Sequence, residues 1–447
     1  MGAAPLQVSA GSGGSTSFEE QTRTAGRAIS RARRAVLWLH RWVGLAMAIV
    51  LLIEGVTGSL LAFRADLTRW LSPVPMVAPP TPGARPLDLG TLAEKAEAIL
   101  RPNGRVAYFG APADGLISLR VEGARNPATG KDLDLGFAWI ILDAYTGKEI
   151  RRLSTYTGYS HQGVVANIMP FVYDLHTSLT FGDTGNWILG IVALSWTIDC
   201  FGGAFLTLPA TVAHFWRRWR PSWRIKRHAS VVRLNFDLHR AGGLWFWPLL
   251  LIFAWSSVEL TLLQVYEPIT RLFVKYSGVE GMLDALPNHP QPRPALSWTA
   301  AQAAGDRIIA RLAAAEGVHV KRPMTLAYFE ANDIYSYSVQ TDRQFPGFTE
   351  LGIYFNGDTG ELVSVNRPNE PDAGAAVTSW LRALHLVGDP VDNLVYRWLV
   401  CVVGLVIAAI SGTGVYIWWK KRRARRWSLA RQHSVTAGNV TAGSAKH

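Results

Sequence analysis

Four long apolar stretches divide the chain. Residues 36–63 are apolar apart from a few polar side chains. At about 1.5 Å per residue, this stretch is long enough to cross the roughly 30 Å hydrocarbon core of a bilayer as a helix. Residues 187–208, 238–263 and 394–419 meet the same criterion. The pattern predicts four transmembrane helices, of which the first is expected to be an uncleaved anchor.

The two long segments between these helices, 64–184 and 266–390, are expected to fold as soluble modules. Each opens with a helix-like stretch and closes on alternating strand-like residues around a polar turn that ends in glycine, which tolerates a positive φ. A proline-rich spacer precedes each helix. The helix-like stretches are 91–100 and 298–312, the turns are Asp143–Gly147 and Asn356–Gly360, and the spacers are 72–86 and 287–294. Each segment is predicted to be a small α+β module.

The positions of Lys and Arg predict the orientation. Residues 1–35, 209–238 and 420–447 hold 20 Lys and Arg against 3 Asp and Glu, whereas the two long segments hold 22 against 26. By the positive-inside rule, both termini and the loop 209–237 are cytoplasmic, and the modules lie outside a bacterial-type inner membrane. The net charge of +12 is interpreted as anchoring to anionic membrane lipid rather than as nucleic-acid binding, because the basic residues adjoin apolar segments.

Several cofactor sites are not expected. The only cysteines, Cys200 and Cys401, each lie in an apolar run, so neither a disulfide framework nor a Cys-rich metal or iron–sulfur site is predicted. There is no Cys-x-x-Cys-His motif for covalent haem attachment. The glycine-rich run at residues 11–15 lacks the spacing of a dinucleotide fingerprint, so no nicotinamide or flavin site is predicted.

The sequence repeats itself. An offset of 199 residues aligns the first apolar stretch with the third, and a looser match relates the phrases before the second and fourth. The matched positions are His40 with His239, Thr57 with Ser256, and His176 with His385. Two copies of helix, module and helix in one orientation imply a pseudo-twofold axis along the membrane normal. The expected fold is therefore an α-helical membrane bundle with a tandem duplication and two extracytoplasmic α+β modules.

Four histidines in register predict two haem sites. A six-coordinate b-type haem takes two neutral imidazoles on opposite faces of one porphyrin, which a pseudo-twofold pair of helices supplies. His40 with His239 is predicted to hold an inner haem b, and His176 with His385 an outer one. Zinc is the competing metal, but it prefers four ligands close together, and two histidines on each side fall short of that number.

Three acids fall inside the predicted spans. Ionised carboxylates are costly there, so each is a candidate for proton transfer or donor binding. Glu259 is expected near the outer interface, and this position is the simplest explanation for an acid in that segment. Glu54 and Asp199 remain as secondary candidate site residues.

The sequence segments around these histidines resemble those of the PepSY-associated transmembrane proteins, also called iron-regulated membrane proteins. The resemblance covers roughly residues 33–422. The outer segments look like the family's PepSY-type domains, and members of the family include inner-membrane reductases of ferric siderophores. The resemblance also implies two b haems with axial ligands at His40, His239, His176 and His385.

The resulting hypothesis is a membrane oxidoreductase. A membrane quinol or a cytoplasmic flavoprotein supplies electrons to the inner haem, the outer haem receives them, and a ferric siderophore or other Fe(III) chelate is reduced outside for iron uptake. Two alternatives stay open. One is a non-enzymatic envelope protein whose modules bind peptides or regulate a protease. The other is a transporter component, which parallel repeats permit but for which three intramembrane acids make a poor permeation path.

Overall fold

The computed structural model describes residues 14–71, 77–126, 129–153, 164–276, 291, 293–345, 348–366, 373–388 and 391–444. The expected proline-rich spacers lie partly outside these ranges. The chain divides into two compact units. Unit 1 comprises residues 1–56, 192–255 and 405–447, and unit 2 comprises residues 57–191 and 256–404.

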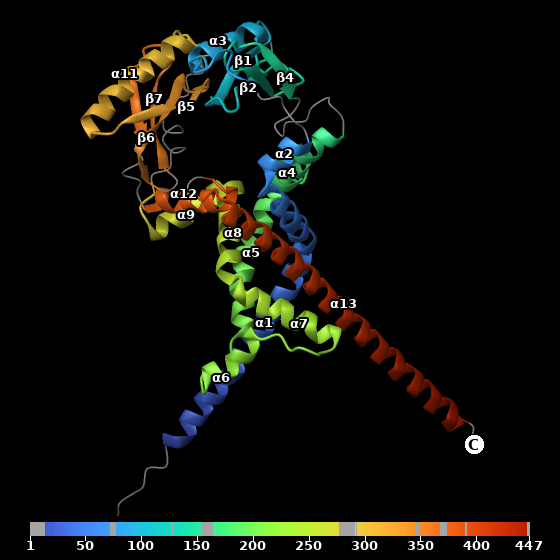
Figure 1. Ribbon diagram of the computed structural model, residues 1–447. Coiled ribbons are helices and arrows are strands. Elements are labelled where there is room, and N and C mark those ends of the chain that lie inside the picture. Colours follow the sequence, from blue (N-terminus) through green and yellow to red (C-terminus); the bar gives the residue numbers. More distant parts are fainter. Residues whose placement is uncertain are drawn as a thin grey trace, which may run out of the picture. The chain divides into compact units, whose positions relative to one another are not determined.

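Three helices in the described ranges are long and apolar enough to cross a membrane, which is consistent with a membrane protein. They are α1 (Gly14–Leu61), α5 (Gly182–Thr207) and α13 (Leu394–Ser444). The segments that meet the criterion are residues 31–61 of α1, the whole of α5, and residues 394–426 of α13. Figure 1 shows the long continuous course of α13.

The expected span 238–263 is divided into two helices. α7 (Val231–Trp245) and α8 (Trp247–Thr261) meet at an angle of 71°, and they qualify as a fourth span only if they are taken together. The cause is Pro248. It has no N–H to donate to the carbonyl of Leu244, and its ring would clash with that carbonyl, so a regular helix cannot continue through this point.

A buried carboxylate organises the loop that precedes α7. Asp237 is fully buried, and its oxygens accept bonds from Arg233 Nε and Arg240 Nη2, each at 3.0 Å, and from the backbone N–H of Lys226 at 3.3 Å. Arg240 also donates to the carbonyl of Pro221. These contacts hold the loop between α5 and α7 against α7, within unit 1. The short helices in this loop are α6 (Phe215–Trp219) and η2 (Arg220–Trp223).

The histidine-containing segments before α5 and α13 form short helices of their own. His176 lies on α4 (Ile168–Ser178) and His385 on α12 (Ala373–Leu386). A residue with positive φ follows each helix, Leu179 after α4 and Val387 after α12, and it ends the helix before the membrane helix begins. The other short helices of unit 2 are α2 (Arg64–Leu71), η1 (Val165–Asn167) and α9 (Leu263–Phe273).

Both soluble segments have the expected order of a helix followed by strands, but they share one sheet. The eight strands are all antiparallel, in the order β4-β3-β2-β1-β5-β6-β7-β8. Both expected turns are present, with Gly147 and Gly360 at φ of 72° and 73°. The elements of the first segment are α3 (Leu89–Leu100), β1 (Gly104–Gly110), β2 (Leu116–Gly123), β3 (Trp139–Asp143) and β4 (Glu149–Leu153). Those of the second are α11 (Trp298–Glu316), β5 (Val320–Phe329), β6 (Ile334–Phe345), β7 (Phe348–Asn356) and β8 (Leu362–Asn366).

The two segments also share one hydrophobic core. Strands β1 and β5 pair along Phe109 and Leu326, and both side chains are fully buried. The helices α3 and α11 pack on this sheet (Figure 1) and are bonded to each other: Glu94 accepts from the backbone and hydroxyl of Thr299, and Gln302 accepts from the backbone N–H of Gly90. A Cβ at Gly90 would lie 2.7 Å from the carbonyl oxygen of Trp298, so this close approach requires glycine. The two predicted α+β modules therefore share one sheet and one hydrophobic core.

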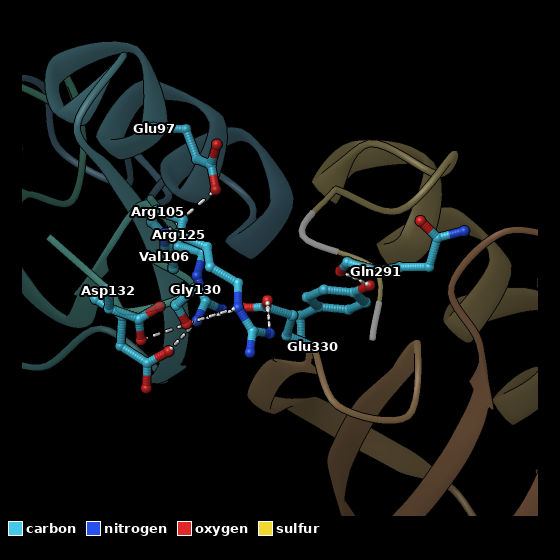
Figure 2. A network of polar contacts seen from close by, with 10 residues as sticks. Glu97, Arg105, Val106, Arg125, Gly130, Asp132, Gln291 and Glu330 are labelled. Atoms are coloured by element: carbon cyan, nitrogen blue, oxygen red, sulfur yellow. Dashed lines mark hydrogen bonds and ion pairs between the residues drawn. The ribbon is translucent and has the colours of Figure 1, made fainter. Parts of the chain in front are cut away.

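Charged residues bridge the two segments beside the β1–β5 seam. Figure 2 shows Arg105 and Arg125 of the first segment directed toward Glu330, which follows β5. The Arg105 guanidinium lies 2.5 Å from Glu330 and 2.7 Å from Glu122, and the guanidinium of Arg125 lies 3.3 Å from Glu330. The Arg105 side chain is 14% exposed and that of Glu330 is 9% exposed. Arg105 is thus a largely buried cation held by acids from both segments.

Replacing Arg105 by methionine is expected to destabilise the sheet domain by about 3 kcal/mol, because removing one partner of a buried ion pair leaves a carboxylate poorly compensated. Arg322→Met is the matched control. Arg322 is an exposed β5 arginine that donates to Gln340, and its loss should change the stability by less than about 0.5 kcal/mol. Urea unfolding of the detergent-solubilised full chain, followed by tryptophan fluorescence, measures both variants. Equal effects of the two variants would show that the seam network adds no stability.

Candidate functional site

Unit 1 brings the imidazole rings of His40 on α1 and His239 on α7 close together. Their ring centres are 6.0 Å apart, and the ring planes are inclined by 57°. Nδ1 of His40 lies 2.9 Å and 3.0 Å from the two carboxylate oxygens of Asp199 on α5. Nδ1 of His239 lies 3.0 Å from the carbonyl oxygen of Ile410 and 3.3 Å from the hydroxyl of Thr413, both on α13. A second helix therefore orients each imidazole.

Unit 2 brings His176 and His385 together in a similar way. Their ring centres are 6.5 Å apart, and their planes are inclined by 56°. Nδ1 of His176 lies 2.8 Å from the hydroxyl of Thr57 on α1, and Nδ1 of His385 lies 2.7 Å from the hydroxyl of Ser256 on α8. The two hydroxyl residues are the pair that the offset of 199 residues aligns.

Glycines lie against three of the four imidazoles. A Cβ added at Gly58 would lie 3.1 Å from Cε1 of His176, and one at Gly414 would lie 3.3 Å from Cε1 of His239. At Gly203 the corresponding distance to Cε1 of His40 is 3.5 Å. Larger side chains at Gly58 and Gly414 would press on the imidazole rings, so glycine fixes where those rings can lie.

Both pairs have the spacing of two axial ligands on one haem iron. A bond between a first-row metal and an imidazole nitrogen is about 2.0 Å long, and the nitrogen lies about 1.1 Å from its ring centre. Two axial imidazoles on one iron therefore have ring centres about 6.2 Å apart. The observed separations of 6.0 Å and 6.5 Å lie on either side of this value. The residues present fit a haem b in each unit.

The partners of the Nδ1 atoms also fit metal binding through Nε2. A carboxylate or a carbonyl can only accept a hydrogen bond, so Nδ1 of His40 and of His239 donates these bonds, and Nε2 is the ring atom that can face a metal. A ligand imidazole must also be neutral. Burial lowers the pKa of His385, and the neighbouring His176 lowers it further, so His385 is neutral at pH 7.

A zinc site would need a cluster of protein ligands around one metal position. Among the residues that the structure describes, no group of three or more His, Cys, Asp or Glu side chains is arranged around a single metal position. Zinc prefers such a group, whereas haem iron needs only two protein ligands because the porphyrin supplies the other four.

Comparison with known families identifies the chain. Its sequence matches the PepSY-associated TM region over residues 37–421, which includes all four histidines. The chain belongs to this family. No curated protein matches the sequence.

All four paired histidines were predicted from the repeat, and one of the secondary candidates, Asp199, contacts His40 of the unit 1 pair. Glu54 is partly buried on α1. We assign it to neither pair.

Glu259 lies in the surroundings of the unit 2 pair. Its buried carboxylate accepts a bond of 2.6 Å from Arg382 Nε on α12. Arg382 precedes His385 by three residues, and Glu259 follows Ser256 by three, so both contacts join the same faces of α8 and α12. The ion pair thus reinforces the bond between Ser256 and His385.

Apart from Asp199, the hydrogen-bond partners of the imidazoles were not predicted. Thr57 and Ser256 align in the repeat, so a signal for them was present, but a small polar residue in a membrane helix is also typical of plain helix packing. Thr413 follows Gly412 and precedes Gly414, in a run typical of close helix packing. The contact with the carbonyl of Ile410 could not be predicted from the sequence, because every residue has a backbone carbonyl.

Proposed function

We propose that this PepSY-associated TM protein is a di-haem b electron-transfer protein that reduces a ferric siderophore or another Fe(III) chelate outside a bacterial inner membrane. The observation that carries the proposal is the pair of imidazoles in each unit, with ring centres 6.0 Å and 6.5 Å apart and every Nδ1 oriented by a polar partner. His40 and His239 would hold one haem, and His176 and His385 the other.

The haems supply one-electron redox chemistry when they are bound, and the chain supplies ligands and their orientation. Each Fe(III) chelate takes up one electron, and its iron becomes Fe(II). Such chelators bind Fe(II) weakly. The donor class is a membrane quinol or a reduced cytoplasmic flavoprotein. A quinol releases two electrons and two protons, so it would reduce two ferric ions.

We further propose that the two halves are a tandem duplication. Equivalent residues take equivalent places: His40 packs on Gly203 and His239 on Gly414, while Thr57 and Ser256 contact the other two imidazoles. The proposal includes PepSY-like modules outside the membrane and cytoplasmic termini, and the basic residues beside the apolar helices support that orientation.

Purified wild-type protein is expected to be red, to respond to dithionite, and to yield two haems b per chain in a pyridine haemochrome assay. The matched control is the double variant His40→Ala/His385→Ala, which removes one ligand from each pair and should be almost colourless. A colourless wild-type protein, produced with sufficient haem precursor, would refute the proposed function.

A further inference from the structure

The four imidazoles differ in the partner of Nδ1. His40 faces the carboxylate of Asp199 at 2.9 Å and 3.0 Å, and His239 faces the carbonyl of Ile410 at 3.0 Å. The unit 2 histidines instead face the hydroxyls of Thr57 and Ser256. The unit 1 pair therefore has one anionic and one carbonyl acceptor, and the unit 2 pair has two neutral hydroxyls.

These acceptors have unequal effects on a metal ligand. When Nδ1–H donates to a carboxylate, the imidazole gains anionic character and becomes a stronger electron donor to a metal at Nε2. Stronger donation stabilises Fe(III) over Fe(II), which lowers the midpoint potential. A hydroxyl is a weaker acceptor because it carries no charge.

The surroundings of Asp199 strengthen its effect. The side chains of His40 and Asp199 are 26% and 15% exposed, so solvent screens their hydrogen bonds only in part. Gly44 and Gly202 flank the carboxylate, since a Cβ at either would lie 3.9 Å or 3.8 Å from an Asp199 oxygen. Ile410 precedes Gly414 by four residues, as Asp199 precedes Gly203, so the acid occurs at only one of two equivalent positions.

We infer that Asp199, acting through His40, gives the unit 1 haem the lower midpoint potential of the two. This inference rests on the proposed function. Asp199 is a positioning residue that touches the ligand and not the iron. A lower potential at His40 and His239 makes one-electron transfer toward His176 and His385 favourable, so the hydrogen bonds of the chain set the direction of flow from donor to Fe(III) chelate.

Redox titration of the purified protein, monitored by its visible spectrum, tests the inference. Asp199→Asn keeps an acceptor oxygen but removes the charge. It should shift the Fe(III)/Fe(II) equilibrium of the lower-potential haem about tenfold toward Fe(II), which is about 59 mV for a one-electron couple. The other haem should keep its midpoint potential. Thr197→Val is the control on the same helix: the Thr197 hydroxyl donates to the carbonyl of Ala193, so its loss removes a polar group two residues from Asp199 without changing a charge and should leave both midpoint potentials unchanged.

Two results would overturn the inference while leaving the proposed function intact: two bound haems with an unshifted lower potential in Asp199→Asn, or equal shifts in Asp199→Asn and Thr197→Val. If Asp199→Asn binds too little haem for a redox titration, titration of the His176→Ala variant tests the inference instead. The haem remaining in that variant must have the lower of the two wild-type potentials, and the higher one would overturn the inference. A wild-type protein without haem would overturn both proposals.

Discussion

His176→Ala is expected to reduce the haem content from two per chain to one and to abolish most ferric-chelate reduction. The substitution removes one axial ligand of the unit 2 pair and leaves His40 and His239, with their Asp199 and Ile410 contacts, unchanged. The remaining haem should keep a six-coordinate b-type spectrum. Pyridine haemochrome quantification, the dithionite-reduced spectrum and the rate of Fe(II) formation from an Fe(III) chelate measure the three effects.

His319→Ala is the matched control for this prediction. His319 is an exposed histidine that precedes β5, and its hydrogen bonds with Asp342 use backbone atoms of His319, so the alanine keeps them. The variant should retain both haems and the full rate. Two haems in His176→Ala would contradict the pairing of His176 with His385 as ligands of one iron.

Gly414→Leu is expected to remove most of the haem from the unit 1 pair. A Cβ at this position lies 3.3 Å from Cε1 and 3.7 Å from Nδ1 of His239, so a leucine must displace the imidazole from its bonds with Ile410 and Thr413. A ligand moved by about 1 Å no longer meets the iron at bonding distance. The haem content should fall toward one per chain, with loss of the lower-potential component in a redox titration.

The same helix provides a close control for this substitution. Gly412 lies two residues earlier on α13, and no heavy atom lies within 4 Å of a Cβ added there. Gly412→Leu makes the same change in helix propensity and apolar surface without touching an imidazole, so it should keep both haems. If both variants lose haem equally, the cause is the helix itself and not the contact with His239.

The apolar pattern located three helices that are long and apolar enough to cross a membrane, because length and hydropathy are local properties. It missed the division at Phe246 because hydropathy ignores the N–H that Pro248 lacks. The order of helix and strands in both soluble segments was visible from alternation and from the turns that end at Gly147 and Gly360. The pairing of β1 with β5 was not, because strand partners distant in sequence are fixed by tertiary packing.

The candidate site was likewise predictable from the sequence only in part. The repeat singled out His40, His239, His176 and His385 because four histidines at matched positions are unusual, and the structure pairs them as the repeat suggested. The environment of each Nδ1 depends on how neighbouring helices are rotated about their axes. Periodicity does not fix that rotation, so it gave no indication that Asp199 would lie at an imidazole.

The shared sheet has a consequence for the ancestry of the chain. If the two halves arose by the proposed duplication, a half-length ancestor with four strands would have had its β1 equivalent as an exposed edge strand, which is prone to aggregation. Two identical copies meeting along that edge across a twofold axis would have paired it antiparallel, as β1 and β5 are paired now. Each copy would then have contributed one imidazole to every pair. Under the proposed duplication, such an ancestor would have worked as a homodimer, and joining two copies in one chain would have allowed the carboxylate at Asp199 to arise in one half alone.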